Sequence, residues 1–354
     1  MTAATHPRHL VLRSPRERLA LKLPLRAVLM LGLLLLALFL TVSVSLATGS
    51  YGVALGDVLD TLRGITVTRA IDNVVWEFRF PRTLAAALVG AMMALSGAAL
   101  QNATRNGLAD PSLVGVSHGA ALAVVTLTVI FPEVSSTWRP WAAFAGAILV
   151  AVAVQGLART RQGGSTIRFI LMGIGLSAFI SSITSAMMTY GEIDRAMAAL
   201  AWLAGSINAA GWSDVWTLLG WSAVLLPALL AVSRTMGALR FGAAAAIGLG
   251  APVRLVRNLQ LAIAVALAAI ATSVVGPLGF VGLIAPHAAQ RMAPAGMAMH
   301  LMLTACIGAL LVSLADLIGR AAFAPLQIPA GLLTALIGVP LFVALLLRSR
   351  ATMH

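Results

Sequence analysis

Three arginines stand where apolar segments begin or end, and their side chains could bind carboxylates. Arg79 and Arg82 precede a long apolar segment, and Arg320 follows Asp316 by one helical turn. A guanidinium group can hold a carboxylate through two parallel hydrogen bonds. Acids of the same chain, Glu77 and Asp316, could satisfy these arginines instead, or their side chains could reach lipid head groups.

Small hydroxyl residues recur every four positions in one apolar segment, at Ser177, Ser181, Ser185 and Thr189. In a helix this spacing places them on one face. In a membrane helix such a face usually allows close packing and hydrogen bonds between helices. It could also form a wettable wall along a passage. Gly331, Thr334 and Gly338 make a similar face of small residues in the last apolar segment.

The sequence lacks the residues for a Walker A loop and for a cysteine-based metal centre. A Walker A loop needs a lysine directly after its glycines, and the single lysine, Lys22, lies in a basic N-terminal tail. The single cysteine, Cys306, lies in an apolar run and can form neither an intrachain disulfide nor a cysteine cluster. His287 and His300 lack metal-ligand spacing to any other ligand. We therefore expect this chain to bind no cofactor or metal of its own.

Composition indicates that membrane helices position these side chains. Hydrophobic residues make up 60% of the 354 residues and charged residues 10%, against roughly 45–50% and 25% in soluble domains. Several stretches of about 20 residues carry no charge, which is the length that a helix needs to cross the hydrocarbon of a bilayer. An all-α polytopic membrane protein is predicted. The net charge of +13 does not indicate nucleic-acid binding, because the basic residues lie in short loops between apolar segments.

Eight single spans and one broken hairpin are expected, which makes about ten crossings. The spans lie near residues 25–47, 80–101, 113–131, 140–158, 167–189, 213–233, 300–318 and 330–348. The uncharged stretch 258–290 is too long for one crossing and too short for two, so it should turn at Gly276-Pro277 with one short limb. Basic residues gather before the first span and after the last, which predicts that both termini are cytoplasmic.

Five short sequence elements lie at the ends of these apolar segments or between them. They read R-F-P-R (79–82), R-N-G-L-A-D-P-S-L-V-G (105–115), W-L-A-G-S (202–206), G-P-L-G-F-V-G-L-I-A-P-H (276–287) and A-D-L-I-G-R (315–320). Together they resemble the FecCD family, the permease subunits of ABC importers for ferric siderophores, haem and vitamin B12. The resemblance covers residues 25–348 and implies a BtuC-like subunit of ten helices.

The resemblance implies roles for three groups of residues. Arg79, Arg82 and Arg320 would pair with acids on a substrate-binding protein. The loop 234–257 would seat in the ATPase through Leu239, Gly242, Ala245, Gly248, Leu249 and Gly250. The hydroxyl face of the fifth span and the small-residue face of the tenth would line a passage at the axis of a permease dimer.

The resemblance also implies the partners and the location of the chain. One permease domain (25–348) would lie in the inner membrane between cytoplasmic tails (1–24 and 349–354). Its partners would be ABC ATPase subunits that use ATP and Mg²⁺, a periplasmic or lipid-anchored binding protein, and a second permease that is identical or homologous.

The expected cargo is an iron-siderophore complex, with haem or cobalamin as alternatives. An ion-driven secondary transporter is less consistent with the sequence, since it would be expected to carry acids midway along its spans. A membrane enzyme would need a catalytic set that the spans do not contain.

The sequence departs from the family pattern in three places. Gly107 replaces a usual proline, Gln327 and Ala330 stand in an element that usually reads E-L-P-x-G, and alanines 243–246 replace usual acids.

Overall fold

The computed structural model describes residues 9–13, 20–49, 52–65, 68–158, 166–322 and 326–350. Within them the regular secondary structure is helical except for one hairpin in the N-terminal tail, in which β1 (His9–Arg13) pairs antiparallel with β2 (Ala20–Pro24). The all-α fold class is thus confirmed for the apolar part of the chain. The remaining predicted tail residues, 1–8, 14–19 and 351–354, lie outside the described residues.

Helices follow one another along the chain through short connections. The long ones are α1 (Leu25–Ala47), α4 (Phe80–Thr104), α6 (Arg139–Ala158), α7 (Thr166–Tyr190), α9 (Trp212–Ala231), α12 (Val253–Val275), α14 (Met297–Ala321) and α15 (Ala330–Arg350). The shorter ones are α2 (Leu55–Leu62), α3 (Arg69–Asn73), α5 (Val116–Val125), α8 (Ile193–Leu203), α10 (Ser233–Leu239), α11 (Ala243–Gly248) and α13 (Val281–Met292). Single π or 3₁₀ turns join some of them: η1 (Val74–Arg79), η2 (Pro111–Val114), η3 (Thr126–Ile130) and η4 (Ser136–Trp138).

The helices match the spans expected from hydropathy. Among the described residues, seven are long and apolar enough to cross a membrane: α1, α4 with the turns before it, α6, α7, α9, α12 and α14. Two shorter apolar stretches, Val116–Ile130 and Ala330–Ala344, and the short helix α13 complete the expected order. Helices α2, α3 and α8 connect the spans and were not indicated by hydropathy, because they are short and carry charged residues.

The broken hairpin turns where the sequence predicted. Helix α12 ends at Val275 and is capped by Gly276, whose φ of +78° suits glycine, and α13 begins after Phe280 and has only 12 residues. A Cβ on Gly276 would lie 2.4 Å from the carbonyl oxygen of Trp202, and the Ser206 amide donates to the Val275 carbonyl at 2.8 Å. The turn therefore packs directly on the W-L-A-G-S element, and the short limb predicted for the hairpin is α13.

Helix α4 forms the centre of the bundle. It packs along α12, α13 and α14, and glycines allow two of these contacts to be very close. A Cβ on Gly90 would lie 2.2 Å from the Gly308 carbonyl oxygen, and a Cβ on Gly97 would lie 1.9 Å from that of Gly282. Backbone-to-backbone contact of this kind is how membrane helices gain packing energy in the absence of a hydrophobic driving force.

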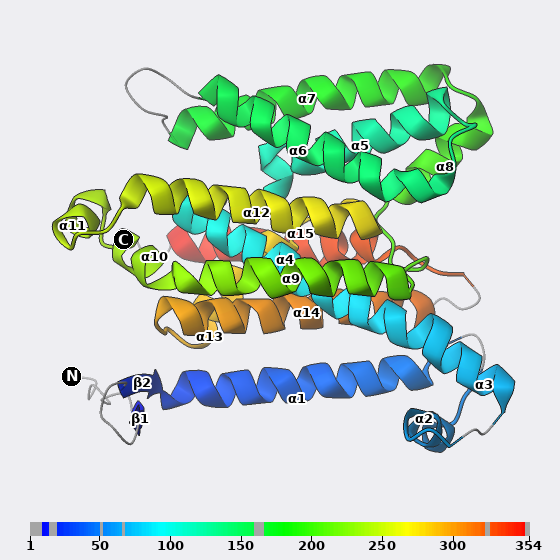
Figure 1. Cartoon of the computed structure of the whole chain (residues 1–354), viewed down its shortest axis with the longest axis horizontal. Coiled ribbons are helices and arrows are strands. Elements are labelled where there is room, and N and C mark those ends of the chain that lie inside the picture. The colour runs from blue at the N-terminus through cyan, green and yellow to red at the C-terminus, as the bar shows by residue number, and fades with distance from the viewer. Residues whose placement is uncertain are drawn as a thin grey trace.

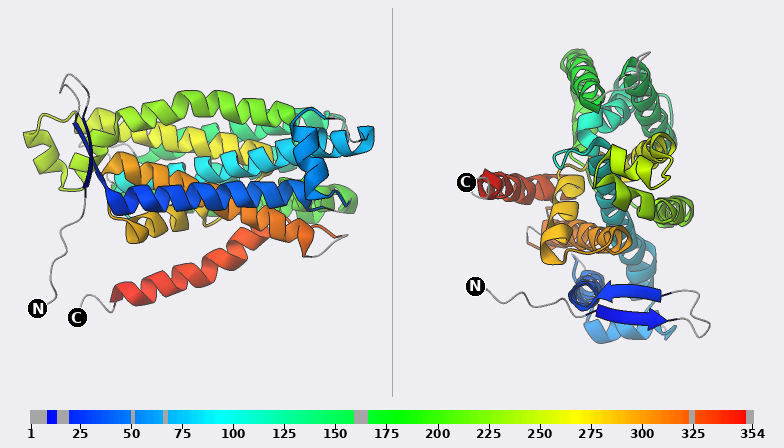
Figure 2. Two further views of the ribbon diagram at one scale, coloured as in Figure 1. Left: turned by 90° about the horizontal axis from the view of Figure 1, so that it is seen from below. Right: turned by 90° about the vertical axis from the view of Figure 1, so that its left-hand side faces the viewer.

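The bundle has two distinct ends (Figure 1). One, called here the α11 end, carries the β-hairpin, α10 and α11; the other, the α2 end, carries α2, α3 and α8. Helices α5 to α8 form a lobe beside the main bundle. Figure 2 shows α15 leaving the bundle obliquely, so that its C-terminal part stands away from the other helices.

Candidate functional site

The three predicted arginines, which come from two distant sequence elements, converge at the α2 end. Arg79, Arg82 and Arg320 line one pocket of about 430 Å³, together with Glu77, Gly49, Asn208 and Gln327. The fold brings them together because η1 and the first turn of α4 lie beside the last turn of α14.

Arg82 is the best-anchored of the three. Its Nε and Nη2 donate to both carboxylate oxygens of Asp316 at 2.8–3.1 Å, and its Nη1 donates to Asn208 Oδ1 at 2.6 Å and to Gln327 Oε1 at 3.0 Å. Its side chain is 12% exposed, while that of Asp316 is 3% exposed. Charge-assisted, two-pronged pairs of this kind fix geometry strongly. Arg82 therefore keeps only an edge toward the pocket.

Arg79 and Arg320 close the end of α1. The last carbonyl groups of a helix have no partner within it. Arg79 Nη1 donates to the carbonyl oxygens of Leu46 and Ala47 at 2.7 and 3.1 Å. Arg320 donates to those of Ser45 and Thr48, to the latter at 2.7 Å. Two cations thus complement the negative end of the α1 dipole.

Two of the arginines predicted to dock a binding protein are largely buried. Arg79 and Arg320 are each only 5% exposed, and their guanidinium groups bind the α1 terminus. They contribute positive potential to the pocket wall rather than free hydrogen-bond donors. Asp316, which sequence spacing placed beside Arg320, approaches it only to 3.7 Å and pairs mainly with Arg82.

The predicted coupling segment forms a short exposed helix at the α11 end. Gly242 (φ +103°) and Gly250 (φ +78°) bracket α11, where both glycines adopt conformations that side chains disfavour. Ala246 faces inward and is fully buried, whereas Phe241, Ile247 and Leu249 are 83%, 63% and 76% exposed. Of the other predicted residues, Leu239 is buried and Ala245 and Gly248 are exposed.

The predicted passage residues divide into two groups. On α7, Ser177 is buried, Ser181 is half-buried, and Ser185 and Thr189 are exposed. On α15 the small residues Gly331, Thr334 and Gly338 all point toward other segments of the same chain. A Cβ on Gly331 would lie 2.3 Å from the Ala204 carbonyl oxygen, and one on Gly338 would lie 2.5 Å from the Phe280 side chain. Thr334 is fully buried. These three residues therefore pack α15 against the rest of the chain.

Sequence reasoning missed two polar residues that the fold places in important contacts. Asn208, two residues after the W-L-A-G-S element, binds Arg82. Asp110 accepts from the amide and the hydroxyl of Ser112 and lies against Gly282, so that two family elements meet there. Burial raises the pKa of Asp110, although both hydrogen bonds act in the opposite direction. The only sequence signal was their position in or beside the elements that punctuate the spans.

Comparison with known proteins identifies the family. The model of the FecCD transport family matches residues 34–348. A probable siderophore transport system permease protein of Bacillus subtilis is 40% identical over 78% of this chain and 82% of its own length. An Fe(3+)-citrate import system permease protein of the same organism is 36% identical over 92% of this chain and 96% of its own length. A vitamin B12 import system permease protein of Shigella boydii is 33% identical over 90% of this chain and 93% of its own length.

A solved structure agrees with these relatives. It is described as an inward-facing conformation of a metal-chelate type ABC transporter. Its fold superimposes on this chain with a TM-score of 0.80 at 27% sequence identity, and the match covers 90% of this chain and 99% of the chain in that structure. The family match covers well over half of the chain, and relatives above 30% identity extend over most of it. The chain belongs to the FecCD transport family.

Proposed function

We propose that this chain is the permease subunit of an ABC importer that carries an iron-siderophore complex across the inner membrane. Relatives named for siderophore, ferric citrate, achromobactin and hydroxamate import support this cargo class. The relative named for vitamin B12 supports cobalamin as the alternative cargo. One observation carries the proposal: the bundle has a cationic pocket at one end and a short helix with exposed apolar side chains at the other.

The α2 end is proposed to face outward and the α11 end the cytoplasm. The β-hairpin of the N-terminal tail and the arginines around α10 to α12 lie at the α11 end, as the positive-inside rule requires of cytoplasmic loops. Both termini would then be cytoplasmic. Cargo would arrive at the cationic pocket and leave beside α11.

We propose that the pocket around Arg82 receives an acidic side chain of the substrate-binding protein. Three arginines there face two acids, Glu77 and Asp316, which leaves a net positive charge among these groups. Gln327 accepts from Arg82 without cancelling that charge, where the family usually has glutamate. The neutral residue at this position should therefore strengthen the attraction for an acidic partner.

Gln327→Glu should weaken binding of the substrate-binding protein by about ten-fold at low salt, because it adds a negative charge beside Arg82. Interferometry on the transporter in nanodiscs would measure this affinity. Gln290→Glu, an equally conservative change at an exposed position of α13 near the other end, serves as the matched control. Equal affinities for both variants and the parent would contradict the docking assignment.

The surface of α11 is proposed to seat in a groove of a separate ATPase subunit. Phe241, Ile247 and Leu249 expose large apolar side chains outside the proposed spans, and such patches in water usually mark interfaces. The alanines in place of acids leave α11 small and uncharged, which suits close packing. ATP and Mg²⁺ would bind the partner and not this chain.

Ile247→Glu combined with Leu249→Glu should abolish ATP-driven uptake, because charges would be buried in the ATPase contact. Uptake and co-purification of the ATPase from membranes are the measurements. Ile65→Glu, at an exposed isoleucine near α2, is the control and should retain both. Normal uptake with the double variant would refute this part of the proposed function.

A second permease copy or a homologue is proposed to complete the passage. The exposed part of the α7 face, Ser185 and Thr189, supplies polar groups for its wall. On α15 the exposed residues are apolar, among them Leu332 and Leu336 at 54% and 70%, and these suit contact with the second subunit.

A further inference from the structure

A groove lies between α6 and α9 in the half of the bundle nearest the α2 end. Both helices pack along α12, yet they make almost no backbone contact with each other. Figure 1 shows α12 running between them. The groove has a volume of about 590 Å³, and Ile270, Ser273 and Val274 of α12 form its floor. It is larger than the pocket around Arg82.

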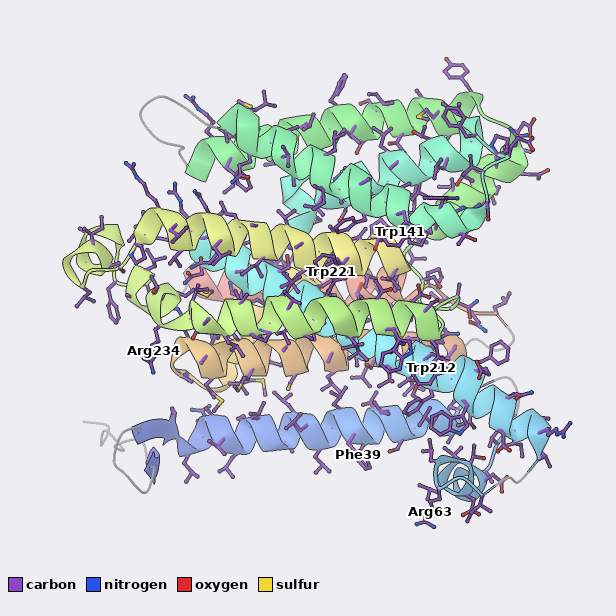
Figure 3. All side chains as sticks on the ribbon, viewed as in Figure 1. Phe39, Arg63, Trp141, Trp212, Trp221 and Arg234 are labelled. Carbon is purple, nitrogen blue, oxygen red and sulfur yellow. The ribbon has the colours of Figure 1, made fainter. Side chains whose placement is uncertain are left out.

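Aromatic side chains form the walls of this groove. Trp141 and Phe144 come from α6, Trp221 from α9, and Trp202 from the end of α8. The rings of Phe144 and Trp221 approach to a centroid distance of 6.3 Å, and Figure 3 shows Trp141 and Trp221 near α12. Trp141 is 66% and Trp221 44% exposed. In a membrane span, exposed rings of this kind face lipid rather than water.

Polarity changes along the groove. Arg139 and Asp214 lie in the first turns of α6 and α9, at the α2 end, whereas Trp221 lies two turns after Asp214 along α9, about 10 Å deeper. The groove therefore has a charged mouth and an apolar interior, as an amphipathic molecule would require.

Two charged groups at the mouth of the groove have hydrogen-bonding atoms available for a ligand. In the part of the chain that the structure describes, the Arg139 guanidinium makes no hydrogen bond or ion pair. Asp214 accepts from the Gly211 amide through Oδ2 at 3.0 Å, and within the same described residues its Oδ1 accepts none. A cation and an anion at one mouth match a head group that carries both charges.

We propose that this groove binds a phospholipid with a phosphate and a primary ammonium group, of the phosphatidylethanolamine class. The Arg139 guanidinium would bind the phosphate, Asp214 Oδ1 would accept from the ammonium, and one acyl chain would lie against Phe144 and Trp221. The groove is distinct from the proposed passage, since none of its lining residues belongs to α7 or α15. A lipid there would brace the lobe of α5 to α8 against the main bundle.

Native mass spectrometry of the purified full-length chain tests this site directly. The detergent-solubilised protein is mixed with dioleoyl phosphatidylethanolamine, phosphatidylcholine or phosphatidylglycerol. We expect the ethanolamine lipid to be retained about ten-fold better than the choline lipid, whose ammonium cannot donate hydrogen bonds. Arg139→Gln and Trp221→Ala should each lower its retention by about ten-fold. Asp214→Asn should remove only the preference for ethanolamine over choline.

Two matched controls keep the result specific. Trp216→Ala removes a tryptophan of α9 that is more exposed than Trp221 and does not line the groove, and Arg63→Gln removes an exposed arginine near the α2 end. Both should retain lipid as the parent does. Unchanged retention in Arg139→Gln and Trp221→Ala would overturn the site. Stronger retention of phosphatidylglycerol than of phosphatidylethanolamine would overturn the head-group assignment. Displacement of the bound lipid by a ferric chelate would overturn the lipid site and make the groove a cargo site instead.

Discussion

Gly97→Leu should leave the chain unable to form a stable bundle. The Cβ atom alone, which any side chain at position 97 would add, would lie 1.9 Å from the carbonyl oxygen of Gly282 and 2.4 Å from its carbonyl carbon. These are backbone atoms of α13, so no side-chain rotation relieves the clash, and α4 and α13 must separate. The loss should exceed about 4 kcal/mol, the range reached by severe overpacking in a core.

Thermal unfolding in detergent, followed by size-exclusion chromatography, measures this effect. Gly32→Leu makes the same change in the middle of α1, where a Cβ would meet nothing within 4 Å. That control should elute and unfold like the parent chain. If Gly97→Leu also kept the parent's unfolding temperature, the close crossing of α4 and α13 would be wrong.

Arg82→Ala should cost about 3–5 kcal/mol of stability, the usual effect of removing one partner from a buried ion pair. Asp316, now 3% exposed, would keep only Arg320 Nε at 3.7 Å, while both Nη groups of Arg320 already donate to the end of α1. The variant should also lose affinity for the substrate-binding protein, because Arg82 is the arginine that keeps an edge in the pocket.

Two companion variants separate the causes. Arg82→Met with Asp316→Leu removes both charges and should recover most of the stability but none of the docking affinity. Arg63→Ala breaks an exposed pair with Asp60, at 3.9 Å, and should cost no more than about 1 kcal/mol. A small loss for Arg82→Ala, similar to that for Arg63→Ala, would contradict the buried pair.

The sequence was sufficient to predict where the membrane spans begin and end, because hydropathy is a local property of the chain. The expected limits of α1 and α6 agree with the structure within a residue, and the break at Gly276-Pro277 follows from an uncharged stretch of intermediate length. The five elements located the arginines but not their partners. Asn208, Asp316 and Gln327 are 126, 234 and 245 residues from Arg82, so only the folded bundle brings them together.

Side-chain direction was the other property that spacing did not determine. Gly331, Thr334 and Gly338 share a face of α15, as predicted, but that face packs on the turn at Gly205 and on Phe280. The sequence pattern identifies a face of small residues, and small residues serve a wall of a passage and a tight helix contact equally well. The apolar surface of α11 was also not visible in the alanine-rich pattern, because it depends on which side of a short helix faces the bundle.

Uptake by reconstituted transporter tests the central claim most directly. Proteoliposomes would contain this chain with the ATPase subunit that co-purifies with it, and the binding protein would be loaded with a ⁵⁵Fe-labelled siderophore. We predict accumulation that requires ATP and the ATPase subunit, survives collapse of ion gradients, and is absent when this chain is reconstituted alone. Accumulation by this chain alone under a proton or sodium gradient would contradict the account.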